Sequence, residues 1–149
     1  MRKIKKLLPP NFLLIYLLLE IILYFVFPLW FIPIPYRIVG ILFIILGVVL
    51  NLWADNLFKK GKTTVKPDKI PTRLITNGSF RISRHPMYLG FVLLLLGVSI
   101  LLGSLTSFTA PVLMFITLQT KFITHEENQM KKVFGEKYRE YEKRVRRWI

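Results

Sequence analysis

The feature that most constrains the fold of this 149-residue chain is a set of three long apolar runs, at residues 12–32, 38–58 and 87–122. A helix of about 20 residues crosses the roughly 30 Å hydrocarbon core of a membrane. The third run would form a helix of about 54 Å, too long for one crossing, so it must turn. The residues Gly103-Ser104-Leu105-Thr106-Ser107 and Pro111 mark that turn. We therefore expect one all-α integral membrane domain, residues 1–149, with helices at about 12–32, 38–58, 87–103 and 108–124, the last two forming a tight hairpin.

The first apolar run carries one acidic residue, Glu20, and follows the basic segment 1–6. A signal peptide begins similarly, but this run is long and ends at Phe-Ile-Pro-Ile-Pro without a small-residue cleavage site. We interpret it as a retained membrane helix. A charge at mid-membrane costs roughly 2.5 to 3.5 kcal/mol on insertion scales. We therefore expect Glu20 to face protein, in a contact with another helix, or to be protonated.

The distribution of basic residues predicts the topology. Of the 22 lysines and arginines, 4 precede the first run, 1 separates the first two runs, 8 lie in the loop 59–84, and 9 lie from Lys121 onward. The positive-inside rule is met when the loop and both termini are cytoplasmic, which places 21 of the 22 on that side. This arrangement explains the net charge of +14 without nucleic acid. We expect a protein of the cell (inner) membrane that contacts membrane lipids.

The tail and the composition limit the chemistry. Over residues 125–148 apolar side chains recur every three or four positions between charges, which predicts an amphipathic C-terminal helix on the membrane or against the loop. Gly135 is the point where this helix could bend. The chain has no cysteine, which excludes a cysteine nucleophile. It has two histidines, which are too few for a convincing zinc site, so we expect no metal.

The strongest candidate for a functional site is Arg84-His85-Pro86-Met87-Tyr88-Leu89-Gly90, where the basic loop meets the third run. Pro86 suits the first position of a helix, and it biases His85 away from helical geometry. Free amides at a helix start can bind an anion, to which Arg84 could add a two-pronged contact. The alternative is an interfacial arginine and histidine, a tyrosine anchor and a simple helix start. The hairpin returns Glu126 and Glu127 to the same face.

The two motifs together resemble those of a known family. Gly-Ser-Phe-Arg-Ile-Ser-Arg-His-Pro-Met-Tyr-Leu-Gly, followed by a hairpin and Glu-Glu-Asn-Gln-Met-Lys-Lys-Val-Phe-Gly-Glu-Lys-Tyr-Arg-Glu-Tyr, is similar to the isoprenylcysteine carboxyl methyltransferase and phospholipid methyltransferase superfamily. The similarity runs from the second helix to the end of the tail and includes residues 61–67 and 103–104. It implies an integral membrane enzyme that uses S-adenosylmethionine at the cytoplasmic membrane face.

The resemblance also implies roles for the motif residues. Cofactor binding carries over to His85, Pro86, Tyr88, Gly90 and Glu126. Arg84 and Glu127 are expected to be catalytic, with Glu127 on the substrate side. Arg84 and the helix start suit the cofactor carboxylate, a glutamate suits its ammonium and ribose, and the His85 or Tyr88 ring suits adenine.

The acceptor stays open at this point. Carboxyl O-methylation of an isoprenylcysteine-like molecule is the family default, but the tail Arg146-Arg147-Trp148-Ile149 lacks the prolines usual in eukaryotic prenylcysteine enzymes. We expect a small prokaryotic relative with a lipid-like or small apolar acceptor. One alternative is N-methylation of phosphatidylethanolamine, for which Glu127 could act as base. The other is a non-catalytic adaptor that binds anionic lipid through its basic tail.

Overall fold

The structure is a computed structural model that describes residues 8–63 and 69–149, so the basic segment 1–6 lies outside it. The described part contains helices and no β-strand beyond a single bridge between Trp30 and Ser104. This confirms the expected all-helical fold. Its α-helices are α1 (Pro9–Val26), α2 (Ile34–Arg37), α3 (Val39–Lys60), α4 (Pro86–Leu102), α5 (Thr109–Thr117), α6 (Thr124–Phe134) and α7 (Glu136–Arg144). Three shorter turns join them: η1 (Gly78–Arg81), η2 (Leu105–Phe108) and the π-helix η3 (Leu118–Ile123).

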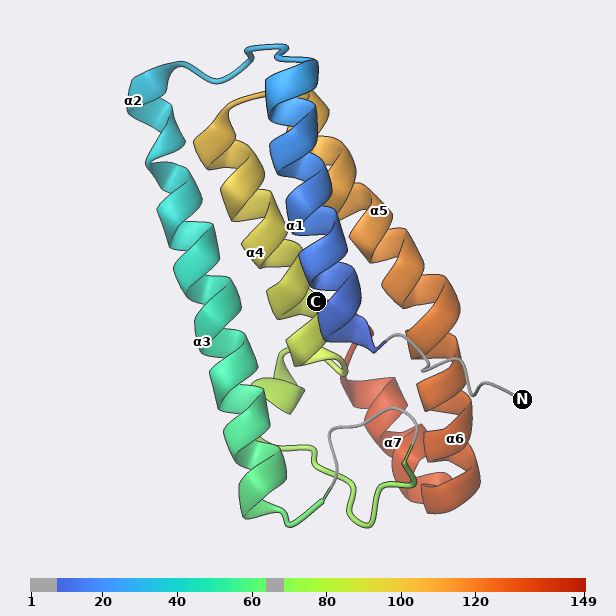
Figure 1. The fold of residues 1–149 in the computed structure, drawn as a ribbon. Coiled ribbons are helices and arrows are strands. Elements are labelled where there is room, and N and C mark those ends of the chain that lie inside the picture. The colour runs from blue at the N-terminus through green and yellow to red at the C-terminus, as the bar shows by residue number, and fades with distance from the viewer. Residues whose placement is uncertain (1–7, 64–68) are drawn as a thin grey trace, which may run out of the picture.

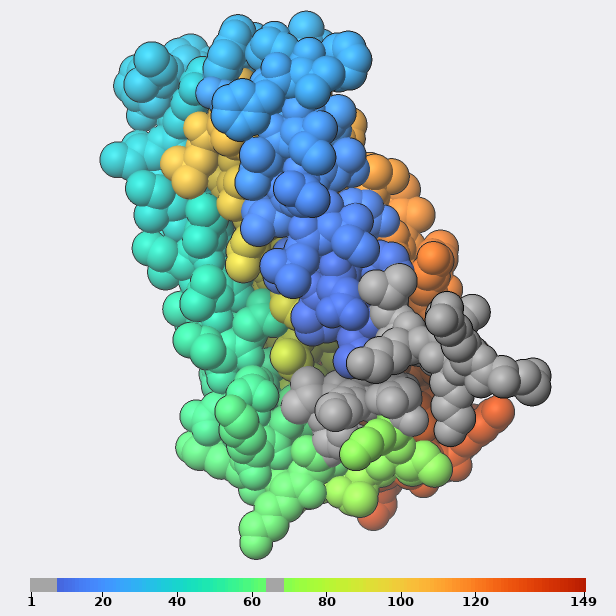
Figure 2. All heavy atoms as spheres, viewed as in Figure 1, coloured from blue at the N-terminus to red at the C-terminus, as the bar shows by residue number. Residues whose placement is uncertain are grey.

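The four long helical segments run alternately up and down, side by side (Figure 1). Helix α4 packs against α1, α3 and α5. Figure 2 shows α4 between α1 and α3 on one face of the molecule. Helices α6 and α7 and residues 69–85 gather at the end where α1 and α4 begin (Figure 1). The polar residues of both motifs therefore meet at one end of the bundle.

Two segments of the described chain are long and apolar enough to cross a membrane, namely Pro9–Val26 and Ile34–Lys60. Most of their apolar side chains are exposed on the outside of the bundle instead of buried in its core. Helix α4 is also apolar but has 17 residues. An exposed apolar surface of this extent suits lipid, and the chain is a membrane protein.

The first helix is shorter than the sequence pattern predicts. We expected residues 12–32, but α1 begins at Pro9 and ends at Val26. Pro28 explains the early end, because its ring clashes with the preceding turn and disfavours helical geometry at Phe27. Hydropathy remains high through this region, so it did not reveal the stop.

The last helices also differ from the prediction. A helix at 108–124 and a separate one at 125–148 were expected, but α5, η3 and α6 form one continuous rod from Thr109 to Phe134. The interruption comes at Gly135, whose φ of 53° and ψ of −125° suit glycine. Helix α7 then ends at Arg144, and Val145, the next residue, is extended.

Glu20 lies inside the bundle, as expected. Its side chain is fully buried, and one carboxyl oxygen accepts a 2.8 Å hydrogen bond from Ser99 Oγ of α4. Ser107 Oγ donates to the Glu20 backbone carbonyl at 3.2 Å. These contacts join α1 to the hairpin and satisfy part of a polar group that lipid would not accommodate.

Two pairs of glycines hold α3 and α4 unusually close. A Cβ built on Gly97 would lie 2.6 Å from the Gly40 carbonyl oxygen, and one on Gly90 would lie 2.8 Å from the Gly47 carbonyl oxygen. Backbone atoms cannot move aside as a flexible side chain can. Small residues at such crossings let membrane helices approach and pack.

We expect Gly97→Val to destabilise the protein by about 1 to 3 kcal/mol, because the added side chain pushes α3 away from α4. Gly97→Ala should produce a smaller loss. The midpoint of thermal unfolding in detergent measures both. Leu42→Val, at an exposed position of α3, is the control and should change little. An unchanged midpoint in Gly97→Val would contradict the close packing.

Candidate active site

The start of α4 presents the first motif. His85 is the N-cap residue with φ of −127° and ψ of 60°, and Pro86 occupies the first helical position. The His85 backbone N–H donates to Ser83 Oγ at 3.1 Å, and Ser83 is fully buried. Pro86 therefore ends the loop where its fixed φ is compatible with a helix. The His85 ring then lies next to Tyr88, with centroids 5.7 Å apart and planes 6° from parallel.

The second motif, Glu126 and Glu127, lies in the first turn of α6. The preceding six residues, Leu118–Ile123, form a π-helix. A π-turn adds a residue to the helical turn and changes which side chains face a neighbouring helix, and such turns are frequent at functional sites. Thr124 Oγ1 donates to the Gln119 carbonyl at 3.0 Å across this irregular turn. The local geometry thus presents both carboxylates to α4.

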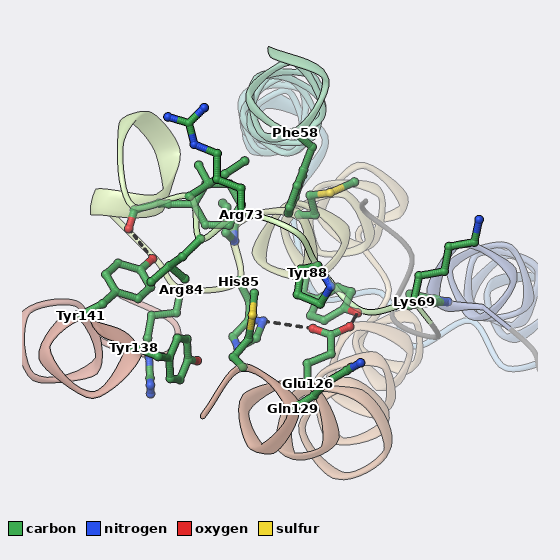
Figure 3. Close-up of a pocket in the computed structure, with 18 of the residues that line it drawn as sticks. Phe58, Lys69, Arg73, Arg84, His85, Tyr88, Glu126, Gln129, Tyr138 and Tyr141 are labelled. Carbon is green, nitrogen blue, oxygen red and sulfur yellow. Dashed lines mark hydrogen bonds and ion pairs between the residues drawn. The ribbon is translucent and has the colours of Figure 1, made fainter. Parts of the chain in front are cut away.

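His85 bridges the two glutamates. Its Nδ1 lies 3.5 Å from Glu126 Oε2, and its Nε2 lies 3.4 Å from Glu127 Oε1. The Tyr88 hydroxyl donates a hydrogen bond to Glu126 Oε1. Figure 3 shows His85, Tyr88 and Glu126 converging from α4 and α6. The two motifs expected to share a face are in direct contact.

Glu127 is held by cations. Its side chain is 4% exposed, and Arg84 Nη2 lies 3.2 Å from Oε1. Arg147 adds a two-pronged contact, with Nε 3.0 Å from Oε1 and Nη2 2.6 Å from Oε2. Arg84 Nη1 also lies 2.8 Å from Glu142 Oε1. Two arginines and His85 therefore surround one buried carboxylate.

The contacts within this cluster shift the pKa values of Glu127 and His85 in opposite directions. Burial alone would raise the pKa of Glu127, but the hydrogen bonds from His85 and Arg147 and the charges of Arg84 and His85 lower it to about 2. Burial would lower the pKa of His85, but its contacts with Glu126 and Glu127 outweigh burial and raise that pKa above its ordinary value. Glu127 is therefore ionised near neutral pH, and its contacts with His85 favour the protonated imidazole.

A cavity of about 310 Å³ opens beside this cluster. Its size is within the range of small-molecule sites. One part of its lining is apolar and comes from the start of α1, from α3 and from α4. The polar side chains that line it are Lys69, Arg73, Arg84, His85, Tyr88, Glu126, Gln129, Tyr138 and Tyr141 (Figure 3). A molecule with both polar and apolar parts suits such a lining.

The structure places the predicted site residues in two groups. Five of them line the cavity: Arg84, His85, Pro86, Tyr88 and Glu126. Glu127 lies behind them and contacts the cavity only through Arg84 and His85. Gly90 lies at the α3–α4 crossing, where a Cβ would meet Asn51 Nδ2.

Sequence reasoning missed several residues of the cluster. Arg147 and Glu142 belong to the charged network, and Tyr138 and Tyr141 line the cavity. The two tyrosines could have been found from the apolar periodicity of the tail, which places both on one helix face. Arg147 gives no such signal, because a basic residue near a chain end is usually interpreted as solvated.

Comparisons with known proteins connect this geometry to a family. Residues 36–137 match the model of the phospholipid methyltransferase family. A probable protein-S-isoprenylcysteine O-methyltransferase of Oryza sativa subsp. indica is 31% identical over 111 residues, which are 72% of this chain and 57% of that protein. Protein-S-isoprenylcysteine O-methyltransferase B of Arabidopsis thaliana is 32% identical over 110 residues, 71% of this chain and 55% of that protein. The chain spans little more than half the length of these relatives.

A solved structure has the same fold. The eukaryotic intramembrane Ras methyltransferase, isoprenylcysteine carboxyl methyltransferase, superposes with a TM-score of 0.67 at 22% identity. The match covers 94% of this chain and 51% of the other. The family match includes Arg84, His85 and both glutamates, which is the cluster beside the cavity. On these findings the chain belongs to the phospholipid methyltransferase family.

Proposed function

We propose that the protein transfers a methyl group from S-adenosylmethionine to a carboxylate of a lipid-like acceptor, as in isoprenylcysteine carboxyl methylation. The acceptor reaches the cavity from the membrane, and the cofactor enters from the cytoplasmic side. The observation that carries the proposal is the joining of the Arg84-His85-Pro86 start of α4 to Glu126 at a cavity with apolar and polar walls.

The residues present fit the cofactor. Glu126 lines the cavity and can accept hydrogen bonds from an ammonium group or ribose hydroxyls. The parallel His85 and Tyr88 rings offer an edge and a face for adenine. S-adenosylmethionine would supply a methyl group made electrophilic by a sulfonium sulfur.

Arg84 fits the acceptor. Its side chain lines the cavity and is 7% exposed, and its buried Nε has no hydrogen-bond partner among residues 8–63 and 69–149. A buried unpaired donor is costly, and a carboxylate would satisfy it. Lys69 and Arg73 add positive charge to the lining, against one glutamate. A lining of this charge favours an anionic acceptor over an ammonium group.

The proposed reaction requires the protein to do little beyond positioning the acceptor and the cofactor. The cofactor would supply the methyl group to a carboxylate oxygen of the acceptor as its carbon–sulfur bond breaks, so the products would be a methyl ester and a neutral thioether. No proton has to be removed, because the acceptor is already ionised. Arg84 orients the acceptor, and the buried walls exclude water from the reacting groups.

The family match also supports a second candidate, N-methylation of an amine lipid such as phosphatidylethanolamine. Glu126, the glutamate that lines the cavity, would then hold the protonated amine and accept the proton that it must lose before the nitrogen can bond to the methyl carbon. The products distinguish the two reactions. A labelled methyl ester releases labelled methanol in base, whereas an N-methylated lipid keeps its label.

Purified protein in detergent is expected to bind S-adenosylhomocysteine, and His85→Ala is expected to weaken binding about tenfold or more, which is about 1.4 kcal/mol. The variant loses the ring beside Tyr88 and the bridge between the glutamates. Isothermal calorimetry measures the affinity. His125→Ala, which changes the other histidine of the chain, is the matched control and should bind normally. Folded protein without affinity for the compound would contradict the proposal and favour the lipid-binding adaptor.

A further inference from the structure

We propose that residues 145–149, called here the strap, fix the candidate active site, and that Arg147 is its positioning residue. Arg147 binds Glu127 and so leaves Arg84 and His85 available to the cavity. The inference rests on the proposed function for its consequence in catalysis. The contacts that support it are seen in the structure and do not depend on the proposed function.

The strap is bound to the loop that carries the first motif. Helix α7 ends at Arg144, and Val145 is extended with φ of −123° and ψ of 129°. The Arg84 backbone N–H donates to the Arg146 carbonyl at 3.1 Å, and Ser83 Oγ donates to the Arg147 carbonyl at 3.0 Å. Ser83 Oγ also accepts the hydrogen bond from the His85 N–H. The backbone on both sides of Arg84 is therefore fixed by the strap.

The strap is anchored at both ends. Val145 packs against the apolar cluster of α3, η1 and α7 that includes Phe80 and Tyr141. Trp148 packs against the other cluster, which includes Tyr88, and its ring lies 4.6 Å from that of Phe115. The Trp148 Nε1–H donates to Gln119 Oε1 at 3.0 Å, within the π-helix that precedes the glutamates. One short segment thus connects the start of α4 to the turn that positions α6.

Arg147 competes with Arg84 and His85 for one carboxylate. Glu127 Oε1 lies 3.0 Å from Arg147 Nε, 3.2 Å from Arg84 Nη2 and 3.4 Å from His85 Nε2. The other oxygen is bound by Arg147 Nη2 at 2.6 Å. A two-pronged pair with arginine is the strongest of these contacts. Without it, the charge of Glu127 would be balanced only by the two side chains that line the cavity.

The test combines ligand affinity with the protonation of His85. Arg147→Ala is expected to weaken S-adenosylhomocysteine binding about tenfold. Arg147→Lys keeps the charge without the two-pronged geometry and should lose about threefold. Arg146→Ala is the matched control, because its exposed side chain lies one residue away and its carbonyl still accepts from Arg84. It should bind as the unaltered protein does.

His85 gives a readout that needs no ligand, because the chain has two histidines and His85→Ala assigns its NMR signal. The charged or titratable groups around it are Arg84, Tyr88, Glu126 and Glu127, with Arg147, Glu142 and Tyr138 behind them. Removing the Arg147 cation should raise the midpoint of the His85 titration by about half a pH unit. Arg146→Ala should leave it unchanged.

The outcomes separate the two proposals. A failure of the unaltered protein to bind S-adenosylhomocysteine would contradict the proposed function, while the His85 titration would still test the strap. A midpoint in Arg147→Ala that is unchanged or lower would overturn the role of Arg147, whatever the ligand does. If Arg147→Ala does not fold, the ligand affinity of Arg147→Lys decides, because the lysine keeps the charge and loses only the two-pronged contact. An affinity equal to that of the unaltered protein would contradict the inference.

Discussion

Arg84→Ala is expected to lower kcat/KM for methyl transfer at least 100-fold, the scale seen when a preorganised donor is removed from a reacting oxyanion. Arg84 is the arginine of the cluster that lines the cavity, and its buried Nε lacks a partner among the described residues. A carboxylate acceptor would lose its orienting contact. The cofactor is assigned to Glu126, His85 and Tyr88, so the affinity for S-adenosylhomocysteine should change less than threefold.

Two further variants make the Arg84 result specific. Arg84→Lys keeps the charge but not the planar fork, so it should recover only part of the rate. Arg81→Ala removes an exposed arginine from the same loop and should retain full activity. The fold should survive Arg84→Ala, because Arg147 still neutralises Glu127 and Lys131 still pairs with Glu142 at 3.0 Å. A normal rate in Arg84→Ala would show that Arg84 takes no part in the reaction. A loss of cofactor affinity as large as the loss of kcat/KM would assign Arg84 to the cofactor instead of the acceptor.

The general architecture was accessible from sequence because the membrane allows few solutions. Apolar runs had to become helices, and the third run had to turn near Gly103, whose φ is 68° in the structure. The ends of the helices were harder to predict from the sequence. The stop at Val26 depends on Pro28 within a run that stays apolar, and hydropathy alone does not report it. The π-helix before Glu126 has no sequence signature in the apolar pattern.

Only part of the candidate site could be predicted from the sequence, because some of its residues depend on partners that only the fold brings close. The contact of His85 with both glutamates follows from the hairpin, which returns the chain to the same end. Gly90 and Arg147 depend on partners far away in sequence. The resemblance implied a cofactor role for Gly90, whereas its place against Gly47 and Asn51 explains glycine by helix packing. Arg147 looks like one of many basic tail residues until the fold brings it to Glu127.

Glu127→Ala is expected to produce the largest loss of stability, about 3 to 5 kcal/mol, as when one partner of a buried ion pair is removed. The change leaves Arg84, His85 and Arg147 close together without the carboxylate that balances them. In a chain of this size the thermal midpoint should fall by roughly 10 °C. Glu136→Ala removes an exposed carboxylate, paired with Arg139 on α7, and should cost less than about 1 kcal/mol.

The pH dependence of stability tests the same assignment. Because the pKa of Glu127 is lowered to about 2 from 4.5, its contribution is fully present above pH 4.5 and is lost as the pH falls toward 2. A shift of this size corresponds to about 3 kcal/mol. His85 has the opposite sign, since its raised pKa gives stability below pH 6.5 that is lost as the pH rises through the folded value. Acid unfolding curves of Glu127→Ala should therefore be flatter between pH 4.5 and 2 than those of Glu136→Ala. Parallel curves would show that Glu127 does not hold the cluster together.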